Sequence, residues 1–89
     1  MSEWKVLLHK RAIKDAELIR QAGLEPQVKA LIQVLRTNPF QIPPQYEKLT
    51  GDLQGYYSRR INIQHRLVYT IDKETKTVKI QSLWTHYER

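Results

Sequence analysis

The chain has 89 residues, of which 15 are Lys or Arg and 9 are Asp or Glu, which gives a formal net charge of +6. This length suits a single modest core, so we predict one domain over residues 1–89. The absence of cysteine excludes disulfides and thiolate metal sites, and the excess of cations favours a polyanionic partner, either nucleic acid or an acidic protein.

No stretch approaches the roughly 20 apolar residues that cross a bilayer. The N-terminal segment lacks the small-residue cleavage site of a secretory signal peptide. We therefore expect a cytoplasmic protein with no membrane association. Its three histidines, His9, His65 and His86, do not have the spacing of a zinc-binding motif, so we expect no metal and no other cofactor.

The first half of the chain predicts a short strand and two helices. Residues 4–8 form an apolar run that is typical of a strand. A helical pattern begins near Lys10, and we expect its buried stripe to consist of Ile13, Ala16, Ile19 and Ala22. Gly23 is the expected left-handed cap that ends this helix.

A second helix is predicted from Glu25 to the Asn38-Pro39 pair, with Pro26 in its first turn, where proline is tolerated. Its apolar positions follow the spacing i, i+3, i+4 and i+7, and they are Val28, Leu31, Ile32 and Leu35. The tight connection to the first helix predicts an antiparallel helical hairpin.

Residues 39–46 carry three of the four prolines and predict an extended connector. Three segments rich in Tyr, Ile, Val and Thr follow, at residues 56–62, 65–72 and 77–84, and the short links between them favour antiparallel strands. The predicted fold is α+β, in the order β-α-α-β-β-β. We expect the helical hairpin to pack on one face of a mainly antiparallel sheet of four or five strands.

Strand parity separates the cations of the second and third predicted strands. Arg59 and Arg60 are successive residues, so their side chains point to opposite faces. The apolar stripe of Leu67, Tyr69 and Ile71 is expected to face the helices. Arg66 then points to the uncovered face, where it is either ordinarily solvated or presented to phosphate as a planar fork.

A carboxylate, arginines and a histidine on one basic sheet are what RNA cleavage without a metal needs. Glu47 could take a proton from the 2′-hydroxyl, the arginines could stabilise the phosphorane oxygens, and His86 could protonate the 5′-oxygen. Taken singly, each of these residues could also be a solvated surface residue or a polar residue with a structural role. His86 has the parity of the core-facing Val78 and Ile80, so it approaches Arg66 only if the last strand bulges near residues 82–85.

The sequence as a whole resembles the Txe/YoeB branch of the RelE-like toxins. The resemblance is carried by PF followed by E-x-L, then GYYSRRIN-x-QHRLVY, and a closing HYE, and it is strong over residues 39–87. Members of that family are toxins of type II toxin–antitoxin pairs and ribosome-dependent endoribonucleases that cut mRNA in the ribosomal A site. The resemblance therefore implies the ribosome and mRNA as partners, together with an acidic antitoxin protein, and a possible homodimer.

The family's residue roles fall on named positions of this chain. The resemblance implies that Glu47 is the general base, Arg66 the phosphate-contacting arginine and His86 the general acid. Arg60, Tyr87 and Arg59 are assigned to RNA contact, although the parity of Arg59 with an apolar stripe favours a structural role, as it does for His65.

Two departures from the family pattern remove potential RNA contacts. Thr50-Gly51 stand where members often carry a lysine, and Trp84-Thr85 stand where many have a basic residue or tyrosine before H-Y. Two alternatives of other classes stay open: a ParE-like toxin that poisons DNA gyrase, which would not need the Glu47, Arg66 and His86 set, and a basic module that binds RNA without cutting it.

Overall fold

The computed structural model describes residues 3–86, with side chains through Trp84. Two helices, α1 (Lys10–Gln21) and α2 (Glu25–Thr37), form the predicted antiparallel hairpin. The His9 side chain caps α1 by accepting a hydrogen bond from the Arg11 amide at 3.2 Å. Gly23 follows α1 with a φ of +73°, which confirms the predicted left-handed cap.

The buried stripe of α1 differs from the prediction. The buried residues are Ala12, Asp15 and Ile19, whereas Ile13 is 61% exposed and Ala16 lies on the outer face. The predicted stripe was therefore wrong except for Ile19. The physical reason is that a carboxylate, Asp15, occupies the centre of the inward face, where an apolar pattern cannot reveal it. The stripe of α2 is confirmed, since Val28, Leu31 and Leu35 are buried.

One five-stranded sheet has the order β1-β5-β4-β3-β2. The strands are β1 (Lys5–Leu8), β2 (Tyr46–Lys48), β3 (Tyr57–Arg60), β4 (His65–Asp72) and β5 (Thr77–His86), with a short 3-10 turn, η1 (Gly51–Leu53), between β2 and β3. Within residues 3–86, β1 alone runs parallel to its neighbour, β5, and the other pairings are antiparallel. The predicted fold class is thus confirmed, and β2 is a strand that the proline-rich connector had concealed.

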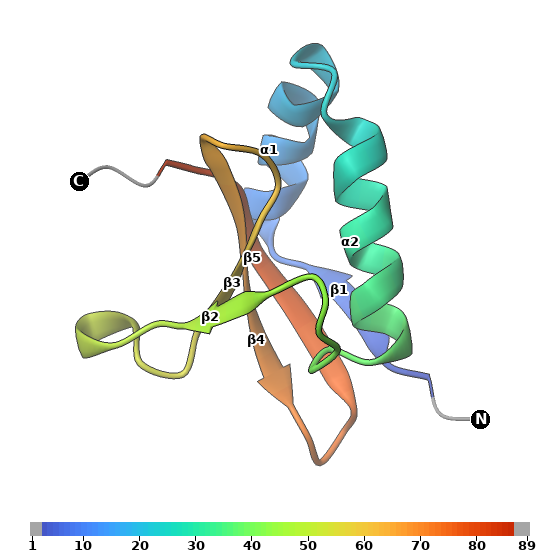
Figure 1. The fold of residues 1–89 in the computed structure, drawn as a ribbon, viewed down its shortest axis with the longest axis vertical. Coiled ribbons are helices and arrows are strands. Elements are labelled where there is room, and N and C mark those ends of the chain that lie inside the picture. Colours follow the sequence, from blue (N-terminus) through green and yellow to red (C-terminus); the bar gives the residue numbers. More distant parts are fainter. Residues whose placement is uncertain (1–2, 87–89) are drawn as a thin grey trace.

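The helices cover one face of the sheet (Figure 1). Their apolar stripes and the inward side chains of β4 and β5 build a core whose fully buried strand residues include Leu67, Tyr69, Val78 and Ile80. The predicted inward direction of Leu67 and Tyr69 is confirmed. No helix in residues 3–86 has both the length and the apolar character needed to cross a membrane.

The opposite face is less open than its sequence suggested. Arg66, Val68 and Ser82 are buried there, and a hollow of about 350 Å³ is bordered by Val68 and Ser82 together with Leu53 and Tyr56. The segment that joins β2 to β3 projects from the sheet on the side away from the helices (Figure 1). It thereby forms one wall of a concave surface.

Pairing between β4 and β5 is irregular near the C-terminus. The register pairs Tyr69 with Ile80, Val68 with Ser82 and Arg66 with Thr85, so β5 uses five residue steps where β4 uses three. Such extra residues are β-bulges, which bend a strand and increase its twist. The strand is thus bulged near residues 82–85, as the sequence required, but an excess of two residues leaves the parity of His86 unchanged.

Candidate active site

Four polar side chains share the face of the sheet opposite the helices. In an antiparallel pair, residues that lie opposite each other point to the same face. Glu47 lies opposite Ser58 across β2 and β3, and Arg60 lies opposite Arg66 across β3 and β4. Ser58 and Arg60 are two residues apart on β3 and so point the same way. Cross-strand register therefore gathers Glu47, Ser58, Arg60 and Arg66 on one surface.

Glu47 and Arg66 are in direct contact. Arg66 Nη1 lies 3.1 Å from Glu47 Oε1 and donates a second hydrogen bond to Ser58 Oγ at 3.2 Å. The Arg66 side chain is 10% exposed, whereas that of Glu47 is 57% exposed. A mostly buried arginine is thus held in one orientation beside a carboxylate that solvent can reach. The sequence predicted both residues, but it held no sign of the contact of Ser58 with Arg66 beyond the parity that Ser58 shares with Arg60.

A cleft of about 320 Å³ opens over this pair. Its lining residues are Pro44, Gln45, Glu47, Ser58, Arg60 and Arg66. Two arginines against one glutamate leave the lining with a formal charge of +1. Arg60 is exposed at the edge of the cleft. The geometry suits an anion that bridges Arg60 and Arg66, because guanidinium groups pair with phosphate oxygens through parallel N–H donors.

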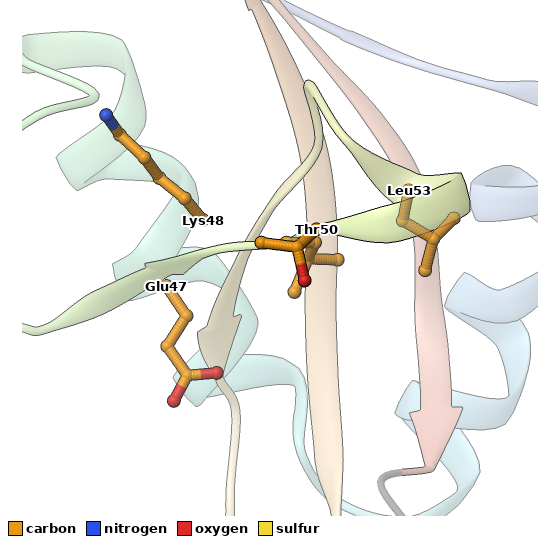
Figure 2. Close-up of a pocket in the computed structure, with 5 residues that line it drawn as sticks. Glu47, Lys48, Thr50 and Leu53 are labelled. Carbon is orange, nitrogen blue, oxygen red and sulfur yellow. The ribbon is translucent and has the colours of Figure 1, made fainter.

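A second hollow, of about 350 Å³, begins at Glu47 on its other side (Figure 2). Glu47 and Lys48 project to opposite sides of β2, as successive strand residues do, and Leu49, Thr50 and Leu53 complete the lining. Glu47 therefore borders two hollows, and the second also carries a lysine, two leucines and a threonine hydroxyl.

Arg59 is not available to RNA, which corrects its assignment as an RNA contact. The residue is fully buried on the helical face of β3. Its guanidinium donates to the carbonyl oxygens of Pro39, Gln41 and Pro44 and, at 3.0 Å, to Tyr69 Oη. It also lies over the ring of Tyr46, with its central carbon 4.9 Å from the ring centroid. Arg59 therefore ties the proline-rich connector to the sheet just before Glu47.

The tyrosines of this region are also largely inward. Tyr57 stacks on Tyr69 with ring centroids 5.7 Å apart. The hydroxyl of Tyr69 is the hydrogen-bond partner of Arg59, and burial raises the pKa of Tyr69 to about 12. Tyr69 is fully buried, and it covers one face of the Tyr57 ring. The exposed aromatic platform of a simple RNA-binding sheet is thus not formed by this pair.

His65 opens β4 and is buried. Its ring stacks on Trp84 with centroids 4.0 Å apart and an interplanar angle of 20°. This contact agrees with the structural role that its parity predicted. Trp84, one of the two departures from the family pattern, thus packs against β4.

The backbone of His86 ends β5 and pairs with His65, one position from the pair of Arg66 with Thr85. Because β5 has two extra residues and not one, the residues of β5 beyond the bulge point to the same faces as they would in a regular strand. The register therefore places His86 opposite His65 and not opposite Arg66. The side chain of His86, like the whole of Tyr87, lies outside the described residues. Within the described part of the chain, no group of three or more His, Asp or Glu residues is arranged to hold a metal ion.

Comparison with known proteins supports the same family as the motifs. A family model described as the YoeB-like toxin of bacterial type II toxin–antitoxin systems matches residues 10–87. The chain is 41% identical over 75 residues to Toxin YoeB of Synechocystis, an alignment that covers 84% of this chain and 78% of the relative.

Solved structures agree with the sequence comparison. The YoeB/ParE toxin from Agrobacterium tumefaciens superposes with a TM-score of 0.82 at 28% identity, covering 93% of this chain and 99% of that one. The YoeB dimer from Staphylococcus aureus gives 0.78 at 32% identity, covering 97% and 100%. A YoeB–YefM complex from the same organism gives 0.76 at 32% identity, also covering 97% and 100%.

Proposed function

This chain belongs to the family of YoeB-like toxins of bacterial type II toxin–antitoxin systems, and we propose that it is an endoribonuclease that cuts mRNA in the A site of the ribosome. The observation that carries the proposal is the 3.1 Å pair of Glu47 and Arg66 in a positively charged cleft that Arg60 borders. An exposed base beside a fixed phosphate ligand is the arrangement that 2′-hydroxyl attack requires.

Glu47 is the proposed general base. A carboxylate has two oxygens and about four lone-pair sites, so Oε1 can stay paired with Arg66 while Oε2 takes the proton of the 2′-hydroxyl. The 2′-oxygen then attacks the adjacent phosphorus. A P–O bond to the 2′-oxygen forms as the bond to the 5′-oxygen breaks, which yields a 2′,3′-cyclic phosphate and a free 5′-hydroxyl.

Arg66 and Arg60 are the proposed phosphate ligands. Negative charge grows on the non-bridging oxygens as the phosphorus becomes five-coordinate. A guanidinium that is already oriented by Glu47 and Ser58 need not reorganise when that charge develops, and such preorganised donors are the largest single contribution to many enzymatic rates. Burial of Arg66 strengthens the effect, because few water molecules screen its charge.

His86 is the proposed general acid for the 5′-oxygen, and Tyr87 a proposed RNA contact. His86 comes from β5, on the far side of β4 from β3. A proton donor there and a proton acceptor on β2 would flank the phosphate held over β3 and β4. The reaction then uses side chains alone: one proton passes to Glu47 and another leaves His86.

We further propose an acidic antitoxin as the partner that neutralises this toxin, since the chain carries a net charge of +6. The YoeB–YefM complex and the YoeB dimer from Staphylococcus aureus support both a cognate antitoxin and a homodimer. Action on ribosomes would place the protein in the cytoplasm.

The test is cleavage of a defined mRNA on programmed ribosomes by the wild type and by Glu47→Ala, Arg66→Ala and His86→Gln. We expect the wild type to cut and each variant to lose at least about 100-fold in rate, the usual contribution of one acid–base group or oxyanion ligand. A supercoiling assay with DNA gyrase runs in parallel. An intact message together with inhibited gyrase would replace the nuclease with the ParE-like function.

A further inference from the structure

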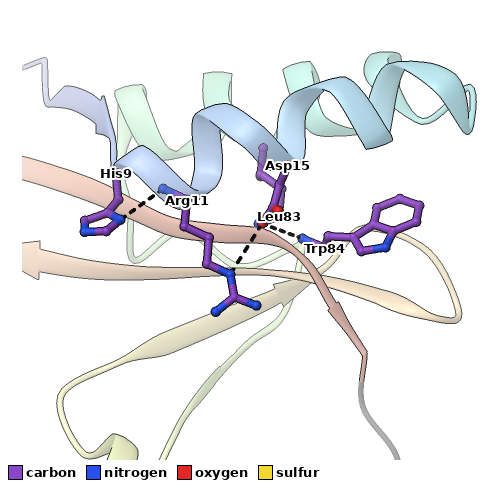
Figure 3. A network of polar contacts seen from close by, with 5 residues as sticks. All are labelled: His9, Arg11, Asp15, Leu83 and Trp84. Atoms are coloured by element: carbon purple, nitrogen blue, oxygen red, sulfur yellow. Dashed lines mark hydrogen bonds and ion pairs between the residues drawn. The ribbon is translucent and has the colours of Figure 1, made fainter.

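A buried carboxylate on α1 joins the helical layer to the last strand. Asp15 lies on the inward face of α1, and its Oδ2 accepts hydrogen bonds from the backbone amides of Leu83 at 3.0 Å and Trp84 at 3.3 Å (Figure 3). Nearly seventy residues of chain separate the carboxylate from these amides. The contact is therefore a feature of the tertiary fold and not of local helix geometry.

These two amides belong to the irregular part of β5. At the bulge, two residues of β5, Leu83 and Trp84, face the single residue Leu67 of β4. A buried amide that loses its ladder acceptor costs about 1–3 kcal/mol unless another acceptor replaces it. Asp15 supplies an acceptor for both amides, and a charged acceptor makes roughly twice as strong a hydrogen bond as a neutral one.

The same segment also makes a ring contact with β4. Trp84 stacks on His65 at 4.0 Å, so both its backbone and its side chain have defined partners. Arg11 lies one turn before Asp15, and its Nε is 4.0 Å from Oδ2, which places a cation beside the buried carboxylate (Figure 3). The strand therefore has a fixed course at Trp84, two residues before His86.

We propose that Asp15 is a positioning residue for RNA cleavage: it fixes the bulged segment of β5, and with it the position of the strand end that carries His86, the proposed acid for the leaving 5′-oxygen. This inference rests on the proposed function, because it assigns Asp15 a role through the general acid of that reaction. The contact of Asp15 with the two amides joins α1 to β5, whereas the proposed phosphate ligands lie on β3 and β4. Loss of Asp15 should thus impair protonation of the leaving group while RNA binding stays intact.

The test compares two leaving groups. One message carries the natural 5′-oxygen at the cleaved bond, and the other carries sulfur at that atom. A thiol has a pKa of about 8.5, far below that of an alcohol, so a thiolate departs without a general acid. Single-turnover rates on programmed ribosomes are measured for the wild type, His86→Gln, Asp15→Ala, Asp15→Asn and the control Glu17→Ala.

Glu17 is a matched control because it is a carboxylate of the same helix that pairs with Arg20 on the exposed surface. We expect Asp15→Ala to lose on the order of 100-fold with oxygen, the cost of about 1 Å of misplacement, and to recover most of the loss with sulfur, as His86→Gln does. Asp15→Asn keeps a neutral acceptor and should slow several-fold with oxygen only. Glu17→Ala should match the wild type on both messages.

The proposal is overturned if Asp15→Ala cuts the oxygen message at the wild-type rate, or if its loss is equal for oxygen and sulfur. If Asp15→Ala does not fold, Asp15→Asn carries the test, and equal slowing on both messages by that variant overturns the proposal as well. A wild type that leaves both messages intact would instead contradict the proposed function, so the two failures are distinguishable.

Discussion

Arg59 lies on β3 and Arg66 on the paired strand β4, yet the surroundings of the two side chains differ completely. The strand pleat sends Arg59 into the core, where carbonyl oxygens surround it, and sends Arg66 to the opposite face beside Glu47. Charge alone cannot distinguish them. Their partners can, because a guanidinium held by three carbonyls has a structural role and one held beside an exposed carboxylate can exchange partners with a phosphate.

The burial of Arg59 predicts a large effect on stability. Replacement by Met would leave the carbonyls of Pro39 and Gln41 without their donor, and each buried unsatisfied polar group costs about 1–3 kcal/mol. We expect Arg59→Met to lower the free energy of unfolding by roughly 3 kcal/mol in a urea titration. Arg60→Met, at the neighbouring exposed position, should stay within about 0.5 kcal/mol of the wild type. Equal losses in the two variants would contradict this role.

Tyr69 predicts a stability change at alkaline pH. Burial raises its pKa from 10.0 to about 12, so between these values the unfolded chain releases the phenolic proton and the folded protein retains it. The unfolded state binds fewer protons there, and stability falls as the pH rises, by up to about 1.4 kcal/mol per pH unit. Urea titrations at pH 9 and pH 11 should show this loss in the wild type. It should persist in the control Tyr56→Phe and diminish in Tyr69→Phe, and an unchanged loss in Tyr69→Phe would argue against it.

Among the elements, the helical hairpin depends on one backbone conformation. Gly23 adopts a φ of +73°, which costs a residue with a Cβ about 1–2 kcal/mol. We expect Gly23→Ala to lower the free energy of unfolding by about 1 kcal/mol and Gly23→Asn to lower it less, since asparagine tolerates this region. The order of the two variants in urea titrations is the measurement, and a more stable alanine variant would exclude the strained turn.

The sequence predicted the elements that have a strong local pattern. The bounds of β4, His65–Asp72, match the predicted strand, and α2 follows its apolar spacing. β2 could not be predicted, because three residues after a proline-rich connector carry no periodicity and become a strand only by pairing with β3. Asp15 was missed for a related reason, since its partners lie on β5.

Much of the candidate site was predicted as separate residues, but its geometry was not. The E-x-L and H-R-L-V-Y motifs identified Glu47 and Arg66, while their contact depends on the register of three strands. The need for a bulge before His86 followed from parity, yet which residue stabilises the bulge is a property of helix packing. Arg59 was included among the RNA contacts, although its parity with an apolar stripe favoured the structural role that its burial supports.

For the whole molecule, the net charge of +6 predicts binding that depends on salt. Each phosphate neutralised by a cation releases counterions, so affinity for ribosome-bound RNA should fall linearly on a double logarithmic plot against salt. Arg60→Gln should reduce the magnitude of the slope by about 1, and Arg20→Gln, in the last turn of α1, should leave it unchanged. Binding that ignores salt would contradict the phosphate contacts.

The carboxylate of Glu47 is the proposed base that removes the 2′-hydroxyl proton, and β2 offers a matched pair of residues to test it. Glu47 and Lys48 are adjacent, exposed and directed to opposite sides of the strand (Figure 2). The measurement is the single-turnover rate of mRNA cleavage on programmed ribosomes for Glu47→Gln and Lys48→Gln. We predict a loss of at least about 100-fold for Glu47→Gln and a rate within a few-fold of the wild type for Lys48→Gln. Rapid cleavage by Glu47→Gln would contradict the role of this carboxylate as the general base.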